Sequence, residues 1–118
     1  MLNQVAVLSI QVHNMNEALA FYTNVLGFEV SKKYGETIVT LKQEAFTIVL
    51  ELAENVHKEP RQNVLPGIIS ENLDQDLAML KDKGVQIIFD EPRPCPPGRY
   101  SIIKDPTGNL IEIIEFSK

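Results

Sequence analysis

The feature of this 118-residue sequence that most constrains its fold is an order of predicted elements that occurs twice. Each half begins with a short apolar strand, continues with a capped helix and ends with three further strand-like runs. The capping residues Asn14 and Asn72 are followed three positions later by Glu17 and Gln75, a spacing typical of helix starts. Because internal repeats indicate repeated structural units, the sequence predicts two βαβββ modules, at about residues 1–53 and 64–118, joined by a polar connector at 54–63.

The period of the apolar residues gives the individual elements. In the first half we expect a strand, a helix and three strands at 5–12, 14–27, 28–34, 36–42 and 46–53. In the second half we expect the same order at 64–70, 72–84, 85–91, 99–105 and 109–116. The proline-rich stretch 92–98 is predicted to be a shaped loop, because proline restricts the backbone. Residues 105–109, with Pro106 and Gly108, predict a tight structural turn.

One helix can cover one face of each sheet, so the other face must be buried against something else. We therefore expect one α+β domain in which the sheets of the two modules curve around a cleft, the predicted place for a ligand. Strand alternation puts Val7, Ser9 and Gln11 on the cleft face, opposite a uniformly apolar face. It puts Glu51 and Glu112, from the last strand of each half, on the same mixed face.

Composition excludes several classes of partner. The net charge of −5 argues against binding to nucleic acid or to an anionic membrane, since both need a basic patch. The single cysteine, Cys95, allows no internal disulfide, which fits a reducing compartment. The first residues lack a basic lead-in and a small-residue cleavage site, so they predict a strand and not a leader or membrane segment. We expect a cytoplasmic protein.

Two motifs at opposite ends of the chain carry a family resemblance. The stretch "VHNMNEALAFYTNVLGFEV" resembles the first-helix signature of the vicinal oxygen chelate superfamily, and "KDPTGNLIEIIEF" is similar to its closing motif. That superfamily includes glyoxalase I, bleomycin-resistance proteins and extradiol dioxygenases. The resemblance covers essentially the whole chain in element order and implies the fold of two βαβββ modules. It does not select one activity, because the fold hosts isomerases, transferases, dioxygenases and binding proteins.

The resemblance also implies four positions for a catalytic metal, one in the first and one in the last strand of each half. Counted from the helix caps, these positions hold Val7, Glu51, Leu65 and Glu112. A catalytic metal needs about three protein ligands and an open position, which two carboxylates and two hydrocarbons do not supply. We therefore expect no cofactor. A shift of two residues offers Ser9 or Gln11 in the first strand, and a divalent metal held by Glu51 and Glu112 stays an open alternative.

Further candidates lie after the proline-rich loop and in the last strand. Arg99 or Tyr100 is placed to reach a ligand, against the plainer alternatives of an exposed arginine and a packed tyrosine. Glu112 is a weak candidate for acid–base catalysis and can equally be a structural carboxylate. Cys95 has no histidine or acidic residue near it in sequence, and a nucleophile needs an activating base.

The leading hypothesis is a metal-independent small-molecule-binding protein of the bleomycin-resistance-like type, which resembles family members that hold organic ligands as homodimers. The predicted ligand-binding residues are Val7, Ser9, Gln11, Glu51, Leu65, Arg99, Tyr100 and Glu112. One alternative is a metal-dependent lyase or isomerase of the glyoxalase type that uses Glu51 and Glu112. A further alternative is a regulatory or interaction module without a ligand.

Overall fold

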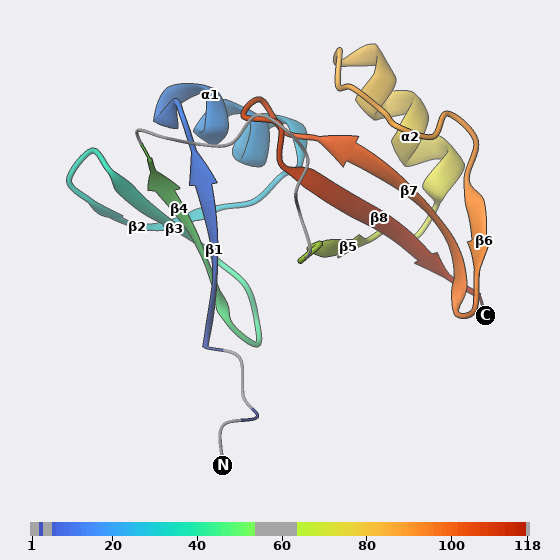
Figure 1. Ribbon diagram of the computed structural model, residues 1–118, viewed down its shortest axis with the longest axis horizontal. Coiled ribbons are helices and arrows are strands. Elements are labelled where there is room, and N and C mark those ends of the chain that lie inside the picture. The colour runs from blue at the N-terminus through green and yellow to red at the C-terminus, as the bar shows by residue number, and fades with distance from the viewer. Residues whose placement is uncertain (1–2, 4–5, 54–63, 118) are drawn as a thin grey trace. The chain divides into compact units, whose positions relative to one another are not determined.

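Two four-stranded sheets organise the chain in the computed structural model, which describes residues 3, 6–53 and 64–117 (Figure 1). The chain divides into two units, Met1–His57 and Lys58–Lys118, here called unit 1 and unit 2. Each unit contains one four-stranded sheet and one helical segment, so the predicted βαβββ modules are confirmed. The predicted connector at residues 54–63 lies outside the described residues. No helix in the described part of the chain is long and apolar enough to span a membrane.

Unit 1 has its sheet in the order β1-β4-β3-β2. The strands β1 and β4 are parallel, whereas β4, β3 and β2 pair antiparallel. Its elements are β1 (Val7–Val12), α1 (Met15–Leu19), the π-helix η1 (Ala20–Val25), β2 (Val30–Tyr34), β3 (Ile38–Leu41) and β4 (Thr47–Leu52).

The first helix begins as the sequence predicts. The Asn14 side chain accepts a hydrogen bond from the backbone N–H of Glu17 at 2.9 Å. After Leu19 the helix widens into a π-helix, and the N–H of Leu26 donates to the carbonyl of Phe21, five residues earlier. The Thr23 hydroxyl donates to the Leu19 carbonyl at 2.6 Å, which competes with the regular α-helical bond. The consecutive residues Phe21 and Tyr22 are both buried against the sheet.

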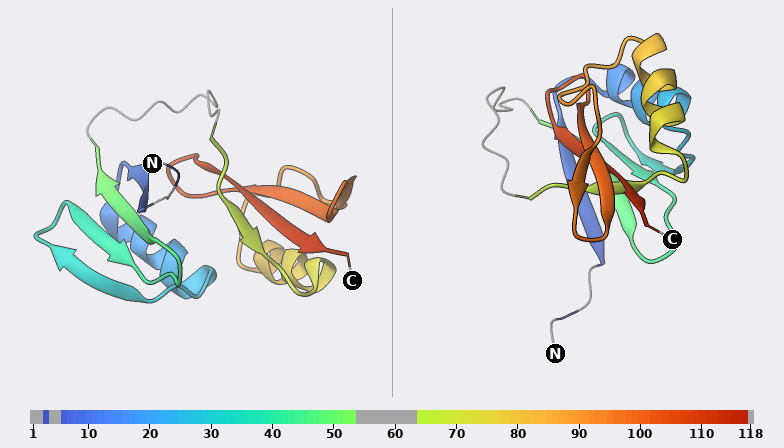
Figure 2. Two further views of the ribbon diagram at one scale, coloured as in Figure 1. Left: turned by 90° about the horizontal axis from the view of Figure 1, so that it is seen from below. Right: turned by 90° about the vertical axis from the view of Figure 1, so that its right-hand side faces the viewer.

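Unit 2 repeats this plan with the sheet order β5-β8-β7-β6, in which β5 and β8 are parallel. Figure 2 shows that each helix lies against one face of its own sheet. Asn72 caps α2 by accepting from the N–H of Gln75 at 3.1 Å, and the predicted stripe of Leu73, Leu77 and Leu80 is buried. The elements are β5 (Gly67–Ile69), α2 (Leu73–Asp82), β6 (Arg93–Cys95), β7 (Gly98–Lys104) and β8 (Leu110–Phe116).

The strand predicted at 85–91 is wrong, and a strand lies in the predicted loop instead. Residues 85–91 make one isolated bridge, between Ile87 and Ile103. Beside it the N–H of Ile88 donates to the Ile102 carbonyl at 2.7 Å. The edge strand β6 lies within the proline-rich stretch, with Pro94 opposite Arg99. Proline is tolerated there because an edge strand has one side that needs no partner for a donor.

The turn between β7 and β8 is built around a buried carboxylate. Asp105 Oδ1 accepts hydrogen bonds from the backbone N–H groups of Thr107, Gly108 and Asn109 at 3.0, 2.9 and 2.7 Å. Its Oδ2 accepts from Nδ2 of Asn109 at 2.9 Å. Gly108 has a φ of 103°, a conformation that favours glycine. The structure supports the structural interpretation of this turn and fixes where β8 begins.

Candidate functional site

Each unit has one sheet face that its helix covers and one face that it leaves uncovered. In unit 1 the covered face holds the buried residues Ile10 and Val12 from β1 and Leu50 from β4. The residues that alternate with them in β1, which are Val7, Ser9 and Gln11, are exposed, and Val7 is 52% exposed. The alternation expected from the sequence is present in β1 and over residues 47–51 of β4, and it ends at Leu52, which is 38% exposed.

The strand register decides which side chains are neighbours on the uncovered face of unit 1. Glu51 lies opposite Gln11 on β1 and opposite Ile38 on β3. Val7 lies opposite Thr47, and these two residues come four positions before Gln11 and Glu51 on their strands. Four residues of extended chain span roughly 13 Å, so Val7 is about that far from Gln11 along the strand. The structure therefore brings Gln11, and not Val7, next to Glu51. An amide and a carboxylate form the polar centre of this face.

Unit 2 arranges the corresponding carboxylate differently. Glu112 on β8 lies opposite Gly67 on β5 and Ile102 on β7. A Cβ atom added at Gly67 would lie 3.4 Å from Oε1 of Glu112, so the carboxylate rests over the bare backbone of that glycine. Leu65 is partly exposed and precedes β5, outside the strand. Glu112 is half-buried on a face that is otherwise largely apolar.

A second row of side chains crosses the uncovered face of unit 2. It runs over all four strands in register, from Ile69 on β5 through Ile114 and Tyr100 to Arg93 on β6. The Tyr100 ring meets the Phe89 ring edge to face, with centroids 6.0 Å apart. The Arg93 guanidinium carbon lies 3.5 Å from the centroid of the same Phe89 ring. Tyr100 thus lies on the face for which the sequence predicts a ligand.

Arg99, the other arginine expected near a ligand, lies on the covered face. It is opposite Glu115 in the sheet, and its Nε donates to Glu115 Oε2 at 3.1 Å. Its Nη2 lies 3.3 Å from Asp74 Oδ2 on α2, while Glu115 Oε1 accepts from the N–H of Leu73 at 2.9 Å. The hydrogen bonds to Glu115 and then to Asp74 raise the pKa of Arg99. Arg99 joins α2 to the sheet, so we keep Tyr100 and not Arg99 in the candidate site.

The sequence interpretation missed Arg93 and Phe89. Arg93 lies in the predicted loop and Phe89 in the strand predicted at 85–91, so neither was predicted to lie on a particular face of the sheet. Two features of the sequence involve these residues. Prolines alternate with Arg93 and Cys95, and Pro92 lies between Phe89 and Arg93. Neither signal points to β6, because the pairing that orders it comes from β7.

The family's metal positions do not fit a metal in this chain. Two of the four carry the hydrocarbon side chains of Val7 and Leu65, and carboxylates alone at the other two are too few donors for zinc or nickel. Within residues 6–53 and 64–117, no three side chains of histidine, cysteine, aspartate or glutamate are grouped so as to hold a metal ion. We derive no chemical step through a metal, and the absence of a cofactor stays a prediction.

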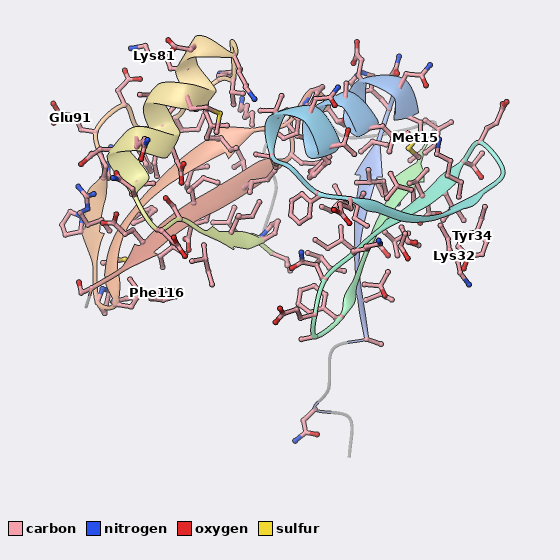
Figure 3. The ribbon with its side chains drawn as sticks, turned by 180° about the vertical axis from the view of Figure 1, so that it is seen from behind. Met15, Lys32, Tyr34, Lys81, Glu91 and Phe116 are labelled. Carbon is pink, nitrogen blue, oxygen red and sulfur yellow. The ribbon has the colours of Figure 1, made fainter. Side chains whose placement is uncertain are left out.

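A pocket of about 520 Å³ lies elsewhere in unit 1, between the start of α1 and the β2–β3 hairpin. Figure 3 shows Met15 directed toward this hairpin. The polar side chains around the pocket include Lys33 and Glu36, of opposite charge, and His13, whose Nε2 lies 3.6 Å from Glu17. None of the ligand-binding residues expected from the sequence lines this pocket, so the candidate site is placed on the uncovered faces.

Comparison with known proteins identifies the family. The model of the Glyoxalase/Bleomycin resistance protein/Dioxygenase superfamily matches residues 2–113. The chain belongs to this superfamily. A search of curated proteins found no significant match.

Several solved structures share the fold over nearly the whole chain. An antibiotic-binding protein from Streptomyces is 26% identical, with a TM-score of 0.74 and 98% of each chain covered. A putative glyoxalase family protein from Bacillus anthracis is 21% identical, with a TM-score of 0.79 and coverage of 99% of this chain and 98% of the other. A lactoylglutathione lyase from Agrobacterium tumefaciens is 17% identical, with a TM-score of 0.73 and coverage of 96% and 93%. The last two likenesses establish the fold alone.

Proposed function

We propose that this chain is a metal-independent binding protein for a small organic molecule, of the bleomycin-resistance-like type. The observation that carries the proposal is the composition of the uncovered sheet faces. Each face has one carboxylate, Glu51 or Glu112, among mainly uncharged side chains. The positions that the family resemblance implies for imidazole-type metal ligands hold Val7 and Leu65. Ligand sites are mostly apolar with a few polar groups that fix orientation. The similarity to an antibiotic-binding protein from Streptomyces supports a ligand of this kind.

The apolar side chains of these faces supply the driving force for binding. Ile69 is 68% exposed and Phe116 is 50% exposed, although both belong to strands of the sheet in unit 2. Large exposed apolar groups that gather on one face mark sites where another molecule binds. Covering them with the body of an organic ligand removes apolar surface from water.

We also propose that the protein acts as a homodimer in the cytoplasm. A second copy would cover the apolar surface that a small ligand leaves accessible. The single cysteine and the net charge of −5 are consistent with a reducing compartment and with a ligand other than nucleic acid.

The binding proposal is tested by calorimetric titration with a panel of aromatic antibiotics, thiol adducts and simple aromatic acids, amides and amines. We expect at least one class to bind, and Glu112→Gln to weaken that binding about tenfold through loss of one charged hydrogen bond. Glu44→Gln removes the same charge from an exposed loop and serves as the control, with affinity unchanged. No binding to any class would overturn the proposal.

The second candidate is a metal-dependent lyase or isomerase of the glyoxalase type. Gln11 favours it, because its amide lies opposite Glu51 and adds an oxygen donor to that carboxylate. Elemental analysis of the purified protein separates the two candidates. Metal at one equivalent per chain would support the enzyme, and protein that stays metal-free and inert after incubation with nickel, zinc, manganese or iron would remove it.

A further inference from the structure

Two arginines lie on β6 and β7 of unit 2, and their surroundings are opposite. Arg99, on the covered face, has Glu115 and Asp74 as ion-pair partners. Arg93, on the uncovered face, has no carboxylate within ion-pair distance among the residues that the structure describes. Figure 3 shows the side chain of Glu91, two residues away in sequence, directed outward at the edge of the unit. The charge of Arg93 is therefore uncompensated next to the candidate site.

The Arg93 guanidinium is also held in place. Its central carbon lies 3.5 Å from the centroid of the Phe89 ring, so the planar group rests on the ring face. Phe89 is itself fixed by the edge-to-face contact with Tyr100, at 6.0 Å between centroids and 88° between planes. Stacking occupies one face of the guanidinium and leaves its N–H donors at the rim without acceptors among the described residues. A guanidinium oriented in this way loses little freedom when it binds a planar anion.

We propose that Arg93 forms a subsite for the carboxylate of a flat aromatic ligand. This inference rests on the proposed function and specifies its ligand class. The carboxylate accepts two parallel hydrogen bonds from the guanidinium, which is the geometry that arginine offers best. The aromatic body then lies over apolar side chains between Arg93 and β8, which are Tyr100 and Ile114 in the row of Arg93 and Ile102 in the next row.

Glu112 binds the end of the ligand that lies away from Arg93. It lies in the neighbouring row of the same face, opposite Ile102, and two strands away from β6. At the usual spacings of strands and residues, its Cα is roughly 12 Å from that of Arg93. That separation accommodates two fused aromatic rings with a polar group at each end. The preferred ligand is an aromatic carboxylate whose far end donates a hydrogen bond to Glu112.

The test compares three probes of one size, 2-naphthoate, 2-naphthamide and 2-naphthylmethylammonium, by calorimetry and by ¹⁵N chemical-shift titration of the full chain. We expect 2-naphthoate to bind about tenfold more tightly than the amide, the usual gain from one charged hydrogen-bonded pair. We expect the shifts to include the Arg93 Nε–H and the amides of Phe89 and Tyr100. Arg93→Gln should abolish the preference for the acid, and Arg93→Lys should retain part of it, since lysine does not stack flat.

Lys81→Gln is the matched control, because it removes the same charge from the exposed side of α2 (Figure 3). It should leave the preference unchanged. Equal affinity for all three probes, or a preference that survives Arg93→Gln in folded protein, overturns the subsite while leaving small-molecule binding intact. No binding of any probe, together with a negative antibiotic panel, means that the proposed function itself has failed.

Discussion

Units 1 and 2 share their element order, their asparagine caps and their parallel first and last strands, yet their uncovered faces differ in chemistry. In unit 1 the uncovered face carries the polar side chains Ser9, Gln11, Thr40 and Thr47 besides Glu51, and Gln11 lies directly opposite that carboxylate. In unit 2 the uncovered face around Glu112 is mainly apolar or aromatic, with Ile69, Tyr100, Ile102, Leu110, Ile114 and Phe116, and its charged neighbour is Lys104, opposite Leu110. The repeated plan therefore fixes where a carboxylate is presented, and the neighbours of that carboxylate set what it can bind.

The covered faces, by contrast, are alike, and they should respond alike to substitution. Leu50 in unit 1 and Ile103 in unit 2 are both fully buried. Leu50→Ala and Ile103→Ala should each lower the free energy of unfolding by about 2–5 kcal/mol, through lost burial and the cavity left behind. Urea denaturation measures this effect. Ile102→Ala, one residue away on the uncovered face of β7, is the control and should cost less than about half as much; equal costs at 102 and 103 would contradict the assignment of the two faces.

Two glycines in the sheet of unit 2, Gly67 on β5 and Gly98 on β7, should respond differently to substitution by alanine. A Cβ at Gly98 would meet the carbonyl oxygen of Glu115, which is backbone and cannot move aside. Gly98→Ala should therefore destabilise the protein by about 1–3 kcal/mol and disturb the β6–β7 hairpin. Gly67→Ala meets a flexible carboxylate at 3.4 Å and should be nearly neutral in thermal unfolding. The Gly98 result bears on the Arg93 subsite too, since β6 presents that side chain; a neutral Gly98→Ala would show that the hairpin is loosely paired.

The helix caps give the smallest expected effect. Asn14→Ala and Asn72→Ala each remove one side-chain acceptor from a helix start and should each cost about 1 kcal/mol. Chemical denaturation of the two variants compares the units directly. Asn14→Asp and Asn72→Asp keep the acceptor and are the controls. Destabilisation by only one of the two alanine variants would mean that the two helix starts contribute unequally to stability, although their caps are alike in geometry.

Local patterns in the sequence were sufficient for the parts of the fold that depend on local physics. The caps at Asn14 and Asn72 follow from spacing, and the alternation of Val7, Ser9 and Gln11 follows from the two-residue period of a strand. The turn at 105–109 follows from Pro106, which presets the backbone, and from Gly108, which accepts a positive φ. The hydrogen bonds that Asp105 accepts in this turn were not predicted.

The candidate site needed long-range pairing, which local patterns do not contain. That Gln11 faces Glu51 depends on the register between strands about forty residues apart in sequence. Arg93 was hidden because prolines at 92 and 94 indicate a loop, whereas an edge strand accepts them. Residues 85–91 were misassigned because a short apolar run reads equally well as a strand or as buried irregular chain.

The parallel pairing of the first and last strands in each unit has a consequence for synthesis on the ribosome. In each unit the opening strand can join its sheet only after the closing strand exists, because β1 pairs with β4 and β5 pairs with β8. Unit 1 can finish its sheet while unit 2 is still being translated. The three-residue β5 waits without its partner until β8 emerges, and non-local pairing of this kind is slow to form. Nascent chains stalled before Leu110 should therefore show a protease-resistant first half and a sensitive second half.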